Sequence, residues 1–262
     1  MRFDRFYTDL LASPDIERVV DSLWKYVTPE LLEDHSNFYP SFNGCLGFSL
    51  ASLYQDGLRL GRSVDPKDVK CVESYLRKCL SLTVENRTLY NMSIALMKPS
   101  GFIDWHYDMH ARSMVCERLH IPMRTHLSCL FYAKNFNSED CFVYRMEEGH
   151  VYRFNNRVPH AVKNDSSINR VHLVLDYVDV EVAEFLLENR LMDSWRQLIL
   201  APIRPIDRVH DCVPDGCSAC PSLPLFGYSK EHVTAMNTSI PDDRNVWKYP
   251  SPGYQMLLSR YA

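Results

Sequence analysis

The chain has 262 residues, of which 46% are hydrophobic, and a formal net charge of −4, so it can bury one full core. Its charged residues are scattered along the chain, which argues against nucleic acid or an anionic membrane as the main partner. The apolar runs have the length of strands, and the start lacks the apolar core of a signal peptide. We therefore expect a soluble, cytoplasmic protein.

Two helices are predicted in the first part of the chain from the same kind of start signal. Ser13-Pro14-Asp15 supplies an N-cap serine, a proline at the first helical position and an acid in the first turn. Asp65-Pro66 repeats the signal before an apolar stripe that runs to Leu80. The polar stretch His35–Gly44 between them is expected to be a loop. Residues 1–90 are thus predicted to form an N-terminal helical flank that braces a sheet.

From Leu89 onward, short β-type runs alternate with polar turns such as Pro99-Ser100-Gly101. The predicted strands are Ser93–Lys98, Ile103–Tyr107, Leu119–Thr125, Ser128–Ala133, Cys141–Met146, His150–Phe154, His160–Lys163 and Val171–Val178. Short strands without intervening helices are typical of a sandwich or barrel. We expect a mainly β fold with a double-stranded β-helix (jelly-roll, cupin-like) core over residues 91–180.

A helix over Val180–Leu200 is expected to pack outside the sheet and to begin a C-terminal extension, residues 181–262. The rest of this extension is rich in proline and has little periodicity. Four soft metal ligands lie close together in it, namely His210, Cys212, Cys217 and Cys220. They could form a closed tetrahedral zinc site. Free thiols or a local disulfide are the alternatives.

The most informative pattern combines two histidines, an aspartate and an arginine. His106 and Asp108 are two residues apart in an alternating segment, so a strand would place both side chains on one face. The distant His160 could complete the two-histidine, one-carboxylate set that non-haem Fe(II) oxygenases use. Arg170 precedes an apolar run, and a buried arginine needs a carboxylate, which 2-oxoglutarate would supply. A solvated strand edge is the alternative.

Four blocks of sequence, in this order, resemble the aspartyl/asparaginyl β-hydroxylase family of Fe(II)/2-oxoglutarate-dependent oxygenases. They are Trp105–His110, Glu117–Thr125, His160–Asn164 and Asn169–Asp176. The resemblance spans roughly residues 93–177 and implies a double-stranded β-helix core.

The resemblance implies that His106, Asp108 and His160 are the iron ligands and the catalytic centre. In related halogenases the carboxylate position is vacant and takes chloride, so the presence of Asp108 favours hydroxylation. O₂ and 2-oxoglutarate would occupy the remaining positions of the metal.

For the cosubstrate, the resemblance implies that Arg170 pairs with the distal carboxylate of 2-oxoglutarate. It also implies that His120 and Arg118 contact the cosubstrate from the neighbouring strand. Turnover would release succinate and CO₂.

We therefore expect an Fe(II)/2-oxoglutarate-dependent dioxygenase that hydroxylates an unactivated C–H bond of an amino-acid side chain. The substrate would be a free amino acid, a small metabolite or a residue in a peptide. Another 2-oxoglutarate-dependent oxidation, such as desaturation or demethylation, is an alternative. A non-catalytic, cupin-like binding module is a third, although such a module needs no iron with open positions.

Overall fold

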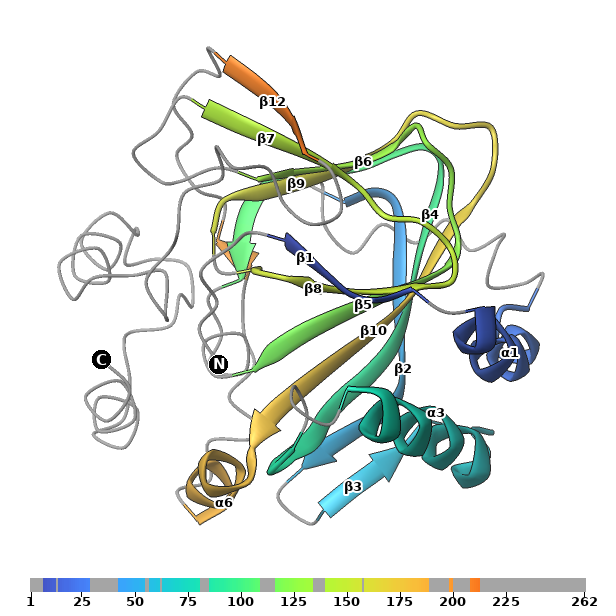
Figure 1. Cartoon of the computed structure of the whole chain (residues 1–262), viewed down its shortest axis with the longest axis vertical. Helices are drawn as coiled ribbons and strands as arrows, with labels where there is room; N and C mark the ends of the chain where they lie inside the picture. Colours follow the sequence, from blue (N-terminus) through green and yellow to red (C-terminus); the bar gives the residue numbers. More distant parts are fainter. Residues whose placement is uncertain are drawn as a thin grey trace, which may run out of the picture.

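A computed structural model of the chain shows a large curled β-sheet with helices along its outer face (Figure 1). The residues that the structure describes are 7–12, 14–28, 42–54, 57–61, 63–80, 85–108, 116–133, 140–156, 158–188, 198–199 and 208–212. No helix within these ranges is long and apolar enough to cross a membrane.

The elements follow one another in an order dominated by strands, which confirms the prediction of a mainly β fold. They are β1 (Tyr7–Ala12), α1 (Pro14–Asp21), the 3-10 helix η1 (Ser22–Tyr26), β2 (Phe42–Tyr54), β3 (Gly57–Leu60), α3 (Pro66–Cys79), β4 (Arg87–Asp108), β5 (Glu117–Arg124), β6 (Cys129–Ala133), β7 (Asp140–Arg145), β8 (His150–Phe154), β9 (His160–Asn164), β10 (Arg170–Asp179), α6 (Val180–Glu188), β11 (Leu198–Ile199) and β12 (Arg208–Cys212). The strand order is β1-β8-β5-β10-β4-β9-β6-β7-β12, and β2 and β11 also pair with β4.

Strand β4 connects the two layers of the sheet. Its first half pairs with β10 and β2, and its last residues pair with β9. The turn predicted at Pro99-Ser100-Gly101 is wrong, because the strand runs through it for 22 residues. Ser100 has φ +61° and Gly44 on the paired strand β2 has φ +66°, so the backbone bends there without reversing.

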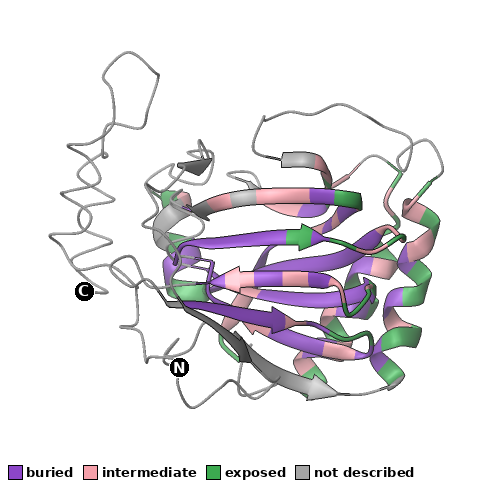
Figure 2. Ribbon diagram, turned by 90° about the horizontal axis from the view of Figure 1, so that it is seen from above, coloured by how far each residue is buried: buried purple, intermediate pink, exposed green. Residues whose placement is uncertain are grey.

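The two faces of strand β10 contribute side chains to two different hydrophobic cores. Val171, Leu173 and Leu175 pack in the outer core beneath α1 and α3. The alternate residues face the space between the two layers, as the period of two requires. That inner core is built from aromatic and aliphatic side chains, among them Phe131, Tyr144, Tyr152, Phe154 and Val162. Most of the strand residues are buried (Figure 2).

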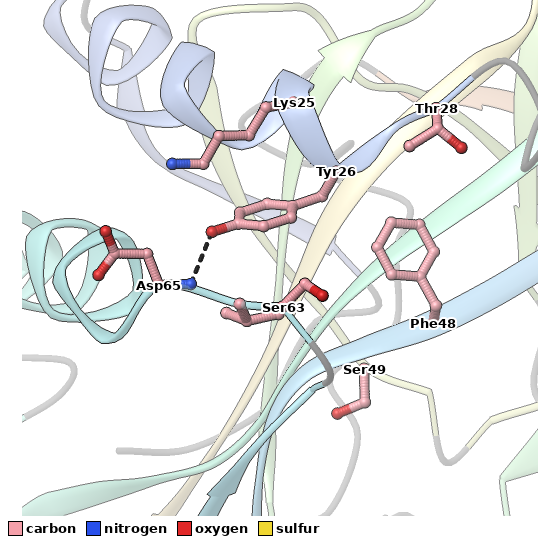
Figure 3. Close-up of a pocket in the computed structure, with 8 residues that line it drawn as sticks. Lys25, Tyr26, Thr28, Phe48, Ser49, Ser63 and Asp65 are labelled. Atoms are coloured by element: carbon pink, nitrogen blue, oxygen red, sulfur yellow. Dashed lines mark hydrogen bonds between the residues drawn. The ribbon is translucent and has the colours of Figure 1, made fainter.

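Helix α3 begins at Pro66, as its sequence signal predicts. The side chain of Asp65 caps it by accepting from the backbone N–H of Lys67 at 2.9 Å. Tyr26 of η1 binds the start of α3, since its hydroxyl donates to Asp68 at 2.5 Å and accepts from the Asp65 backbone N–H at 2.8 Å. A cavity of about 440 Å³ lies beside this contact (Figure 3). Because Phe48 lines it and packs against the outer core, the cavity lies on the helix side of the sheet.

The first 90 residues also contribute strands β1, β2 and β3, which the sequence analysis did not predict. Strand β2 overlaps the stretch His35–Gly44 that was expected to be a loop. Glycines and small polar residues in β2 obscure the alternation that identifies a strand. Helix α6 ends at Glu188, and Leu198–Ile199 pairs with the end of β4, so the helix predicted to Leu200 is too long. The boundaries of the three predicted regions stay a prediction.

Candidate functional site

The predicted metal ligands come from two paired strands. His106 and Asp108 lie at the end of β4, and His160 is the first residue of β9. His106 and His160 are direct partners in the β4–β9 register, so the two backbones bring them together. The side chain of His106 lies outside what the structure describes, and its role stays a prediction. No cluster of three potential metal-binding side chains is present among the described residues.

Asp108 is buried, with 5% of its surface exposed, and two side chains of the described residues donate to its carboxylate. Oδ2 accepts from Nη1 of Arg118 at 2.7 Å and from Nδ2 of Asn156 at 2.8 Å. The backbone N–H of Asp108 also donates to the carbonyl of Asn156 at 3.0 Å. Donors of this kind favour the ionised form of a carboxylate, which is the form that binds metal.

His160 is buried, and its ring is oriented by a backbone carbonyl. Nδ1 lies 2.8 Å from the carbonyl oxygen of Val158. A carbonyl can only accept, so Nδ1 carries the proton and Nε2 is the nitrogen with a lone pair. That tautomer is the one with which histidine binds metal through Nε2. The ring edge of Phe154 packs against His160, with the ring centroids 5.3 Å apart.

Arg170 is a buried cation, 3% exposed, and no carboxylate pairs with it among the described residues. Its Nη2 donates to Nδ1 of His172 at 2.9 Å, and its guanidinium lies 4.7 Å from the ring centre of Phe131. Its Nε has no hydrogen-bond partner in the described part of the chain. Burial lowers the pKa of Arg170 to about 10. An uncompensated buried charge is costly, so this environment suits a ligand that brings a carboxylate.

Two further buried ring nitrogens lack partners near Arg170. They are Nδ1 of His120 and Nε2 of His172, considering the described residues alone. The centroids of the His120 and His172 rings lie 5.8 Å apart. Burial, followed by the charge of Arg170, lowers the pKa of both histidines well below the usual value, so both are neutral near pH 7. His172 is buried, and within the described part of the chain only Nδ1 of its ring is hydrogen-bonded.

Arg118, predicted to contact the cosubstrate, lies between two carboxylates. Its Nε and Nη2 donate to the two oxygens of Asp176 at 2.7 and 3.1 Å, and its Nη1 donates to Asp108. Burial disfavours the charged guanidinium, but Asp176 and Asp108 outweigh it and raise the pKa of Arg118. A contact with the cosubstrate stays a prediction.

Sequence reasoning assigned no role to Asp176 or Asn156. Asp176 could have been found, because an inward-facing arginine needs a carboxylate and Asp176 lies directly opposite Arg118 in the β5–β10 register. Asn156 follows β8 in a connecting segment, where no pattern distinguishes it.

The model of the aspartyl/asparaginyl beta-hydroxylase family matches residues 51–179, which confirms the resemblance seen in the sequence blocks. The match begins upstream of those blocks, within β2. No curated protein matches the chain by sequence.

Several solved structures are similar to this chain. The non-heme alpha ketoglutarate dependent epimerase SnoN from nogalamycin biosynthesis has a TM-score of 0.50 at 9% identity, over 67% of this chain and 78% of that chain. A prolyl hydroxylase from Trichoplax adhaerens has a TM-score of 0.48 at 12% identity, over 69% of this chain and 86% of that chain. A 2OG-Fe(II) oxygenase family protein from Burkholderia pseudomallei has a TM-score of 0.43 at 12% identity, over 63% and 89%. At such identities a similarity shows the fold alone, and the similarity to SnoN agrees with the double-stranded β-helix predicted here.

Proposed function

We propose that the chain is an oxygenase of the aspartyl/asparaginyl β-hydroxylase kind, whose family model matches residues 51–179, and that it hydroxylates an amino-acid side chain. The reaction would use Fe(II), 2-oxoglutarate and O₂. The observation that carries the proposal is the buried cation of Arg170, which has no carboxylate partner among the described residues. His120 lies between Arg170 and the predicted metal ligands. Its ring packs against Phe131, over which the Arg170 guanidinium lies, and against Phe154, which also packs against His160.

The metal would be held by His106, Asp108 and His160. Bound Fe(II) would supply the activation of O₂, the oxidant that converts 2-oxoglutarate to succinate and CO₂ and hydroxylates an unactivated C–H bond. The protein's own contribution is to keep its ligands in the binding form. Val158 fixes the proton of His160 on Nδ1, and Arg118 and Asn156 hold one oxygen of Asp108.

The cosubstrate would lie between Arg170 and the metal ligands. The guanidinium of Arg170 would bind the distal carboxylate of 2-oxoglutarate, and His120 would offer a neutral ring nitrogen beside it. Phe131 packs against His120 with ring centroids 5.5 Å apart, and Phe154 does so at 5.9 Å. These apolar rings exclude water from the carboxylate, which strengthens its attraction to the guanidinium.

The substrate class is drawn from the family, and a free amino acid, a small metabolite and a peptide all remain within the proposal. The fold itself does not select hydroxylation, because SnoN carries it and is named an epimerase. Desaturation or demethylation is therefore the second candidate.

Two other expectations stay predictions. A cytoplasmic location is one of them, and the zinc site is the other. His210 and Cys212 lie in β12, but the structure describes only their backbone. Cys217 and Cys220 lie outside the described residues.

The test is a turnover assay that follows succinate formation from 2-oxoglutarate with Fe(II), O₂ and a panel of amino acids and short peptides. We expect one class of substrate to increase succinate formation and to gain 16 Da. Arg170→Gln should lose this activity at low 2-oxoglutarate, whereas Lys163→Gln, which alters an exposed pair with Asp165, should keep it. Binding of metal and 2-oxoglutarate without any substrate-dependent turnover would favour the binding module.

A further inference from the structure

We propose that Arg118 and Asp176 form a positioning pair that holds the carboxylate of Asp108 in place as a negatively charged metal ligand. The inference rests on the proposed function, because it assumes that Asp108 binds the metal. It gives Arg118 a role distinct from the cosubstrate contact that the family resemblance implies, and it gives Asp176 a role for the first time.

The geometry of the pair uses three of the donor groups of Arg118. Two of them form a bidentate contact with Asp176, at 2.7 and 3.1 Å, and the third reaches Asp108 at 2.7 Å. Bidentate contacts between arginine and a carboxylate fix the plane of the guanidinium. Asp176 therefore determines where the remaining donor points, and that donor determines the position of Asp108.

The pairing of the strands brings two of these three residues together. Arg118 on β5 and Asp176 on β10 are direct partners in an antiparallel pair, so both side chains project from the same face. Asp108 comes from the far end of β4, in the other layer. Its contact with Arg118 thus joins the end of β4 to the β5–β10 pair.

Two donors of the described residues converge on one oxygen of Asp108. Nη1 of Arg118 and Nδ2 of Asn156 approach Oδ2 at 2.7 and 2.8 Å. Two directed hydrogen bonds of this kind hold the carboxylate in one orientation, which is how the outer partners of a metal ligand position it.

The charges of the three side chains explain why Arg118 beside Asp108 requires Asp176. A guanidinium alone beside Asp108 would neutralise the ligand and repel a divalent cation. Asp176, whose side chain is 1% exposed, compensates the charge of Arg118. The three groups together then keep a net charge of −1 for the metal, while Asp108 retains its hydrogen bond.

The test measures Mn(II) affinity by calorimetry on the full-length protein, followed by 2-oxoglutarate affinity at saturating Mn(II). We expect Asp176→Asn to weaken Mn(II) binding about 10- to 100-fold, the usual range for outer partners of a ligand. The reason is that the charge of Arg118 becomes uncompensated. The double variant Arg118→Gln/Asp176→Asn should recover much of this loss, because the cation is then absent and a glutamine amide can still donate to Asp108.

Arg87→Gln is the matched control. Arg87 of β4 is an arginine with a side chain 11% exposed, and it pairs with Glu117 and Asp179. Glu117 precedes Arg118 in β5 and faces the opposite side of the strand. This variant should lower the free energy of unfolding while Mn(II) affinity in the folded protein stays unchanged. It separates a loss of stability from a loss of positioning.

Three outcomes would overturn the inference. Unchanged Mn(II) affinity in Asp176→Asn would show that the pair does not position the ligand. If Arg118→Gln lost 2-oxoglutarate affinity at saturating Mn(II) and kept its metal affinity, Arg118 would be a direct cosubstrate contact. If the unsubstituted protein bound no divalent metal, the proposed function would fail together with the inference.

Discussion

Arg170 donates from Nη2 to Nδ1 of His172, 2.9 Å away and two residues further along the same face of β10. A guanidinium can only donate, so this contact fixes the proton of His172 on Nε2. The guanidinium also lies over the ring of Phe131 in the inner core. His172 is therefore a positioning residue for Arg170, in a part of the site where no acidic side chain compensates the charge among the described residues.

Replacing Arg170 by methionine should separate ligand binding from folding. Loss of charge-assisted hydrogen bonds, worth about 1.5–3 kcal/mol, should weaken 2-oxoglutarate binding roughly 10- to 100-fold at saturating Mn(II). The free energy of unfolding without ligand should stay the same or rise, because a buried, uncompensated charge is removed. Calorimetry and urea unfolding measure the two quantities. A marked loss of stability with normal 2-oxoglutarate affinity would contradict the assignment of Arg170.

His172 should make the protein less stable in mild acid. Its pKa in the folded state is well below the usual value, because of burial and then the neighbouring Arg170 and His120. As pH falls below about 6.5, the unfolded chain takes up a proton at this position and the folded chain does not. Stability is therefore lost as pH falls, with a slope that approaches about 1.4 kcal/mol per pH unit.

The variant His172→Asn removes that titration and keeps an acceptor for Arg170. Urea unfolding at pH 7, 6 and 5 should show a shallower dependence on pH in the variant than in the unsubstituted protein. Equal slopes in both proteins would mean that His172 is protonated in the folded state, against the environment described here.

Leu173 offers a contrast with its neighbour His172, because it faces the outer core and is fully buried. Truncation to alanine should cost about 2–5 kcal/mol of unfolding free energy, from lost burial and the cavity left behind. The affinity of the folded protein for 2-oxoglutarate should not change. A specific loss of affinity with intact stability would show that the two faces of β10 are not independent.

Much of the sheet could be predicted from the sequence. The predicted strands from Leu119 to Val178 lie within two residues of β5 to β10, because each is a short apolar run between clear turn residues. The same reasoning failed at Pro99-Ser100-Gly101, where turn residues produce a bend inside one strand. It also missed β2, whose glycines and polar residues carry little alternation.

The proposed site followed from the sequence only in part. Spacing along the chain was enough to propose His106, Asp108, His160 and Arg170 as a site, and their roles stay predictions. The contact between Arg118 and Asp176 depends on the register of β5 against β10, 58 residues apart in the chain. Register across strands is set by tertiary packing and cannot be obtained from either segment alone.

In the proposed site, Asp108 binds a divalent metal and Arg170 binds 2-oxoglutarate. The most direct measurement is thermal unfolding with Mn(II), which replaces Fe(II) without turnover, in the presence and absence of 2-oxoglutarate. At about a hundredfold excess over the dissociation constant, a ligand should add about 2.7 kcal/mol, which corresponds to several degrees. We predict a shift with 2-oxoglutarate that requires the metal and is absent in Asp108→Ala. No shift with any divalent metal, or the same shift in Asp108→Ala, would contradict the claim.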